Sequence, residues 1–250
     1  MRFSTLCLAG ALSLPLCSTA LAEDYWLPVT GSDCQVWSDE KPDGDQVSWS
    51  GKCTNGKISG KGMLEWKRGS ELAGTYDGWM DGGKFNGFGE LRLGPSGKQS
   101  KLVGFFEDGE ISGGGIYTDA KGNVYEGGLQ DGEPHGSGYA SADGEEYVGG
   151  FQNGKRQGIG YLITQDDLYI GEFESDQADG SGVMEDSQGG RYHGQFVDGK
   201  PHGHGTYITA KGAVYQGRFA EGEANGPFMV TSETGAEPVM EIYKNGEKAE

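Results

Sequence analysis

One short pattern returns eight times along this chain: an aromatic residue, a glycine two positions later, and a Gly-x-Gly nine positions after that glycine. Three copies read YEGGLQDGEPHGSG at 125–138, YVGGFQNGKRQGIG at 147–160 and YHGQFVDGKPHGHG at 192–205. The period is 22–23 residues after two longer early units, and the repeats start at Trp49, Tyr76, Leu102, Tyr125, Tyr147, Tyr169, Tyr192 and Tyr215. Self-similarity at this period predicts an array in which each unit packs on its neighbours.

Each repeat, numbered from its first residue, is typical of a β-hairpin. Positions 1, 3 and 5 alternate between large apolar residues and glycine, which is the period of a strand. A turn such as Asn153-Gly154 or Asp198-Gly199 follows, and these dipeptides favour positive φ. The second strand has glycine at positions 12 and 14 and, in most repeats, a large apolar residue at 16. We expect position 5 to pair with position 12, position 3 with position 14 and position 1 with position 16. The side chains at all six positions would then lie on one face of the sheet.

The glycine content follows from this architecture, since positions 3, 8, 12 and 14 hold 30 of the 48 glycines. Glycine weakens a strand, so the aromatic rings must lie in the space that the glycines leave and supply the burial. A second class of turn, such as Lys121-Gly122, links one repeat to the next. The sequence therefore predicts an all-β protein: an elongated, single-layer antiparallel meander of about eight hairpins, twisted and curved.

The pattern resembles the MORN (membrane occupation and recognition nexus) repeat, whose units read approximately Y-x-G-x-x-x-x-G-x-x-H-G-x-G. The resemblance covers about 49–230 and is poorest in the repeat at Leu102, at Asp176, and at Phe228, which replaces the last glycine of the eighth repeat. It implies a scaffold, because MORN arrays mediate protein contacts or oligomerisation, and some are linked to phospholipid binding.

Other segments flank the repeats. Residues 1–22 combine Arg2, an apolar stretch and an Ala-Leu-Ala end, which predicts a cleaved bacterial signal peptide and a periplasmic or secreted protein. Residues 23–48 are expected to cap the first hairpin. Residues 231–250 are expected to form a C-terminal capping strand, over 239–243, and a polar tail.

Charge limits the partners. The formal net charge is −18, and removal of residues 1–22, whose only charged side chain is Arg2, makes it −19. Such a chain repels nucleic acid, and a membrane surface is disfavoured as a partner, because Lys and Arg form no clustered basic patch. A protein partner of unknown identity is expected, and assembly with further copies of the chain stays open.

The cysteines predict one disulfide bond. Loss of the signal peptide leaves only Cys34 and Cys53, which in an oxidising compartment are expected to pair and to staple the N-terminal cap to the first repeat. Their spacing matches no zinc motif.

No catalytic constellation is present in the sequence, so we expect no enzyme and no cofactor. Four Gly-x-x-x-x-Gly-Lys matches, such as 149–155, lack the Ser or Thr of a P-loop and fall on the predicted hairpins. His193, His202 and His204 lie in one repeat and are expected to share the face opposite the glycines, where they form a candidate zinc or copper site. The alternative is that histidine at position 11 only follows the repeat pattern.

The tyrosines at position 1 have two interpretations. They either complete the core with the phenylalanines at position 5, or form a face that stacks on a peptide or glycan; the row comprises Tyr125, Tyr147, Tyr169, Tyr192 and Tyr215. The leading hypothesis for function is a non-enzymatic interaction scaffold exported to the bacterial envelope. The alternatives are a phospholipid-binding module and a ribbon that binds envelope glycan or peptide.

Overall fold

The computed structural model describes residues 24–39 and 44–249, so the predicted signal peptide lies outside the described residues. The chain divides into two compact units, Met1–Asp143 and Gly144–Glu250, which are described separately. In the described part of the chain every regular element is a β-strand, as predicted.

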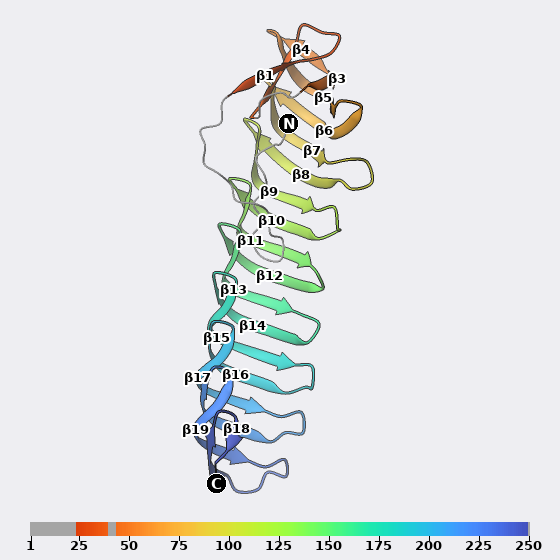
Figure 1. Cartoon of the computed structure of the whole chain (residues 1–250). Coiled ribbons are helices and arrows are strands. Elements are labelled where there is room, and N and C mark those ends of the chain that lie inside the picture. Colours follow the sequence, from red (N-terminus) through yellow and green to blue (C-terminus); the bar gives the residue numbers. More distant parts are fainter. Residues whose placement is uncertain (1–23, 40–43, 250) are drawn as a thin grey trace. The chain divides into compact units, whose positions relative to one another are not determined.

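The first unit contains eleven strands (Figure 1): β1 Tyr25–Pro28, β2 Gln35–Ser38, β3 Asp45–Trp49, β4 Lys52–Thr54, β5 Lys57–Arg68, β6 Glu71–Asp81, β7 Lys84–Leu93, β8 Ser100–Glu107, β9 Glu110–Thr118, β10 Val124–Gln130 and β11 Glu133–Ala142. From β5 to β11 each strand pairs antiparallel with the next. The long strand β5 also pairs with β3 and β4, which together form the first strand of the first repeat.

The second unit contains ten strands: β12 Glu145–Gln152, β13 Lys155–Ile163, β14 Asp167–Glu174, β15 Gln177–Asp186, β16 Arg191–Val197, β17 Lys200–Ile208, β18 Val214–Ala220, β19 Glu223–Thr231, β20 Val239–Lys244 and β21 Glu247–Lys248. Consecutive strands again pair antiparallel throughout, and β20 lies beside the last repeat hairpin. The predicted antiparallel meander is confirmed in both units.

The register within each hairpin agrees with the prediction at two of its three pairs. Tyr147 lies opposite Leu162 and Gly149 opposite Gly160, which are the pairs 1–16 and 3–14. The pair 5–12 is wrong, because Phe151 lies opposite Arg156, at position 10. Two extra residues in the second strand create a β-bulge at this point, and they shift every pair between the bulge and the turn.

Position 12 lies within the bulge. Gly158 has a φ of 74°, and glycine at this position has positive φ in every repeat. A Cβ atom built on Gly158 meets nothing within 4 Å, so the backbone conformation, and not space for a ring, requires glycine here. Gly158 pairs with Phe173, at position 5 of the next repeat, so the predicted partnership exists between repeats and not within one.

Positions 3 and 14 have the predicted role of making room for a ring. A Cβ atom on Gly149 would lie 2.3 Å from the hydroxyl oxygen of Tyr147, and a Cβ atom on Gly160 would lie 2.4 Å from the same ring. The tyrosine side chain therefore lies flat over the two paired glycines of its own hairpin.

The rings of successive repeats form one continuous row in the second unit. Tyr147 meets Phe151 of its own repeat and Phe173 of the next edge to face, with both centroid distances at 5.1 Å. The same alternation continues through Tyr169, Phe196, Tyr192 and Phe219 at 4.9–5.2 Å. Each ring thus packs against a ring of its own hairpin and against one of the neighbouring hairpin. This packing compensates for the stability that the glycines cost the strands.

The N-terminal strands meet the turns of the first repeats. The backbone amide of Gln35 donates to the carbonyl of Gly56, and that of Trp37 donates to the carbonyl of Gly83. Cys34 and Cys53 are placed for the predicted disulfide, with Cα atoms 5.9 Å apart. Since Cys34 is buried and Cys53 lies on β4, such a bond would join this segment to the first repeat.

Candidate functional site

The five tyrosines of the row do not form a continuous exposed binding face. Tyr125, Tyr147, Tyr169 and Tyr192 are 0–5% exposed, and Tyr215 is half-buried. Of the two interpretations of this row, the core is therefore the one that the structure supports, and phenylalanine rings of the following repeats contact Tyr147, Tyr169 and Tyr192.

Four of these tyrosines also close the bulge of their own hairpins. The hydroxyl of Tyr147 donates to the carbonyl of Gly150 at 3.0 Å, and the hydroxyl of Tyr169 donates to that of Glu172 at 2.9 Å. The same bond to position 4 recurs in the repeats that begin at Tyr76, Tyr125 and Tyr192. The bond satisfies a carbonyl in the distorted part of the hairpin.

Burial also raises the pKa of the phenols. The pKa values of Tyr125, Tyr147 and Tyr169 each rise to about 12, mainly because burial disfavours the tyrosinate. The hydroxyls therefore stay protonated over the ordinary pH range and act as hydrogen-bond donors within the core.

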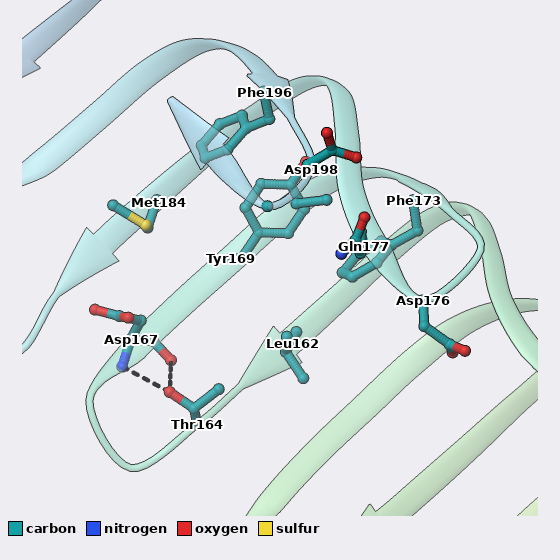
Figure 2. Close-up of a pocket in the computed structure, with 12 residues that line it drawn as sticks. Leu162, Thr164, Asp167, Tyr169, Phe173, Asp176, Gln177, Met184, Phe196 and Asp198 are labelled. Atoms are coloured by element: carbon teal, nitrogen blue, oxygen red, sulfur yellow. Dashed lines mark hydrogen bonds between the residues drawn. The ribbon is translucent and has the colours of Figure 1, made fainter. Parts of the chain in front are cut away.

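A hollow of about 260 Å³ lies on the ring face of the second unit (Figure 2). Its apolar wall consists of the rings of Tyr169, Phe173 and Phe196 together with two aliphatic side chains, Leu162 and Met184. The rim is acidic, with carboxylates at both ends of the strands: Asp167, Asp176 and Asp198. The volume lies below the roughly 300–1,000 Å³ of sites for drug-sized ligands, so it suits a single side chain.

The hollow exists because position 10 of this repeat is Ala178. Position 10 points to the ring face, since it pairs with the phenylalanine at position 5. In the first unit the same position is filled by the buried side chains of Ile58, Phe85 and Ile111. Alanine leaves that space open beside the rings of Tyr169 and Phe196.

Local structure holds the acidic rim in place. The loop before β14 is closed by the backbone amide of Asp167, which donates to the Thr164 hydroxyl at 2.9 Å (Figure 2). Partial burial, and then the charges of Asp166 and Asp186, raise the pKa of Asp167. Crowded carboxylates of this kind favour a cation beside them. At the other end, the Asp198 turn is held by the Gly199 amide, which donates to the Ala178 carbonyl at 2.9 Å.

The three histidines of the candidate metal site do not all line one depression. His193 and His204 line the same shallow depression on the face away from the rings, but His202 does not. The bulge separates them, because His202 pairs with Gln195 while His193 pairs with Thr206. Among the described residues no group of three or more His, Cys, Asp or Glu side chains is placed to hold a metal ion.

Sequence reasoning missed an exposed aromatic cluster on the opposite face of the first unit, made of Trp79, Phe88 and Phe105. These side chains are 52%, 53% and 60% exposed, and the two phenylalanine rings meet at 5.7 Å. They line a shallow depression together with Asp81 and Asn86. All three occupy position 4 or 13, which the repeat pattern leaves variable, so the signal was an aromatic residue at an outward-facing position.

No helix with the length and hydropathy of a membrane span occurs in residues 24–39 and 44–249.

Comparison with curated proteins finds similarity to alsin. A segment of 95 residues is 34% identical to alsin of Rattus norvegicus and 35% identical to alsin of Mus musculus and of Homo sapiens. The segment is 37% of this chain but only 5–6% of those proteins, so the chain corresponds to a small part of each relative.

A family model described as the MORN repeat matches six segments that together cover half of the chain: 54–71, 103–124, 125–144, 147–166, 169–191 and 192–214. The repeat at Leu102, where the sequence fits the pattern poorly, is thus matched. The repeats at Tyr76 and Tyr215 fall outside the matches, although their hairpins have the same 1–16 and 5–10 pairs. The repeat pattern, the common hairpin register and the family match together show that the chain belongs to the MORN-repeat family.

Proposed function

We propose that this chain is a non-enzymatic interaction scaffold that binds a protein partner in the envelope of a bacterium. The observation that carries the proposal is the hollow lined by Tyr169 and Phe196, because it offers apolar walls and charged rim groups to an inserted side chain. Membership of the MORN-repeat family supports it, since these repeats generally serve as protein or membrane interaction modules.

Export is part of the proposal. It is supported by the sequence of residues 1–22 and by the pairing of Cys34 with Cys53, since disulfides persist in oxidising compartments. Sequencing the N-terminus of protein recovered from the envelope fraction is expected to find Glu23. Recovery of a chain that still begins at Met1 would contradict export by a cleaved signal.

The partner is sought by immobilising the protein and identifying bound envelope proteins by mass spectrometry. The control variant is Ala178→Arg, which fills the hollow. Replacing Tyr147 and Tyr169 by alanine is not a suitable control, because both side chains are buried and their loss would unfold the core. A partner in stoichiometric amount that the variant no longer retains would support the scaffold. If no protein binds in stoichiometric amount, the scaffold proposal fails.

A second candidate function, stacking on envelope glycan, is favoured by the exposed cluster Trp79, Phe88 and Phe105. Aromatic rings that stay exposed on a sheet surface suit the apolar faces of sugar rings. Titration with soluble peptidoglycan fragments is expected to change Trp79 fluorescence, and Phe105→Ala should weaken the effect while Ile159→Ala, at an exposed position of the second unit, does not. A response to phospholipid vesicles and not to glycan would favour membrane binding instead.

A further inference from the structure

The second unit contains its own example of a cation held in the ring face. The guanidinium of Arg156 lies 5.7 Å from the ring centroid of Tyr147 and 5.6 Å from that of Phe173. Its Nη2 donates to the backbone carbonyl of Asp176 at 2.9 Å, and its Nε lies 3.7 Å from the Asp176 carboxylate. Its Nη1 lies 3.7 Å from the carboxylate of Glu145. Two rings and two carboxylates thus surround one guanidinium.

The hollow is the same place one repeat later. Arg156 pairs with Phe151 and Ala178 pairs with Phe173, so both residues occupy position 10 of their hairpins. The backbone contact at this position is also conserved between the two repeats. The Asp176 amide donates to the Arg156 carbonyl at 3.1 Å, and the Gly199 amide donates to the Ala178 carbonyl at 2.9 Å.

The walls of the two places correspond residue by residue. Tyr169 and Phe196 stand where Tyr147 and Phe173 stand in the preceding repeat, and their rings meet at 4.9 Å, compared with 5.1 Å. Asp167 takes the place of Glu145, two residues before the tyrosine. Asp198 adds a carboxylate at the turn, beside Gly199.

What the later repeat lacks is the cation itself. Ala178 has no side chain to fill the space, and among the described residues no Lys or Arg forms an ion pair with Asp167 or Asp198. We propose that the hollow binds the guanidinium group of an arginine side chain from a protein partner, against the rings of Tyr169 and Phe196 and beside Asp167. This inference rests on the proposed function and names the chemistry of its partner.

Guanidinium suits the hollow better than ammonium. Guanidinium is planar and stacks on aromatic faces. Its five N–H donors have fixed directions, so that it can donate to two carboxylates at once. The formal net charge of −18 adds a long-range attraction for a basic partner, although that attraction does not distinguish arginine from lysine.

The test uses N-acetyl-arginine amide as the probe and N-acetyl-citrulline amide as its neutral isostere. Binding to the whole protein is followed by the NMR signals of the aromatic side chains. Saturable binding of the arginine probe, with shifts at the rings of Tyr169 and Phe196 and none with citrulline, is expected. Equal binding of the two probes, or shifts spread over the surface, would overturn the inference.

Variants localise the effect. Ala178→Arg should abolish binding, because the protein's own guanidinium then fills the hollow. If that variant folds poorly, Ala178→Leu fills the hollow without adding a charge and should also abolish binding. Asp167→Asn should weaken binding about fivefold, as expected for one ion pair at an exposed rim. Glu174→Gln is its matched control, since the same charge is lost on the opposite face. Unchanged binding by a folded Ala178→Arg or Ala178→Leu would refute the site.

The outcomes separate the inference from the proposed function. If a protein partner binds but Ala178→Arg retains it, and the arginine probe does not bind, the hollow is not the site while the scaffold proposal stands. If the arginine probe binds at the hollow but no protein partner is found, the scaffold proposal fails while the chemistry of the hollow is supported.

Discussion

At the scale of single residues, glycine has two separate roles within one hairpin. Gly149 and Gly160 make room for the tyrosine ring that lies over them. Gly158 supplies the positive φ of the bulge, where a Cβ atom would meet nothing. The two roles respond differently to substitution, because one is limited by space and the other by backbone conformation.

Asparagine distinguishes the two roles, because it tolerates the left-handed conformation better than alanine does. At position 158 alanine should cost about 1–2 kcal/mol of unfolding free energy, and asparagine clearly less. At position 149 both should cost about 2–3 kcal/mol, since each adds a Cβ atom against the Tyr147 ring and the Gly160 backbone. Urea unfolding of the four variants measures this. Rescue by asparagine at position 149 would contradict the assignment.

At the scale of the element, the hairpin is stable only through its neighbours. Phe173 meets the ring of Tyr169 in its own hairpin and that of Tyr147 in the preceding one, each at 5.1 Å. An isolated hairpin is marginal in water, so these contacts between hairpins contribute much of the stability.

Removal of one ring should therefore destabilise the unit as a whole. Phe173→Ala is expected to lower the unfolding free energy by about 3–5 kcal/mol, because it leaves a cavity beside two tyrosines. The matched control is Ile159→Ala in the adjacent strand, where the side chain is 70% exposed and the change should be within about 0.5 kcal/mol. Thermal unfolding compares the two, and equal melting temperatures would mean that the ring row is not the core.

At the scale of the whole molecule, each of the two units contains buried tyrosines. Folding raises the pKa of Tyr125 in the first unit and of Tyr147 and Tyr169 in the second to about 12, from the ordinary value of 10.0. The folded state then holds protons that the unfolded state has lost. The contribution of these phenols to the unfolding free energy is therefore fully present below pH 10 and is lost as the pH rises from 10 to about 12.

Unfolding by urea at several alkaline pH values checks this dependence. Tyr147→Phe should reduce the slope of stability against pH, because it removes one of the contributing phenols, at a cost of about 0.5–1.5 kcal/mol for the lost hydrogen bond to Gly150. Stability that stays constant from pH 10 to 12 would contradict the burial of these phenols.

The disulfide should stabilise the first unit by restricting its unfolded chain. Reduction, or replacement of both Cys34 and Cys53 by serine, is expected to cost about 3 kcal/mol for a loop of this length. The double variant gives the control, since a reducing agent should lower the melting temperature of the wild type and leave that of the variant unchanged. A wild type insensitive to reduction would show that the bond contributes nothing.

The sequence by itself determined the hairpins, the pairs 1–16 and 3–14, and the role of the paired glycines, because alternation and turn chemistry are local signals. It did not determine the position of the bulge, since the same glycine at position 12 fits either a flat strand or a left-handed residue. The predicted pair of positions 5 and 12 was wrong for this reason.

Only the tertiary structure decided which side chains are accessible. The burial of Tyr147 and Tyr169 depends on rings contributed by adjoining hairpins, and this contact has no local signature in the sequence. The hollow depends on Ala178 lying beside two such rings, one repeat after the repeat in which Arg156 fills the same place. A single small residue in a periodic array therefore creates a site that becomes recognisable only when the repeats are packed side by side.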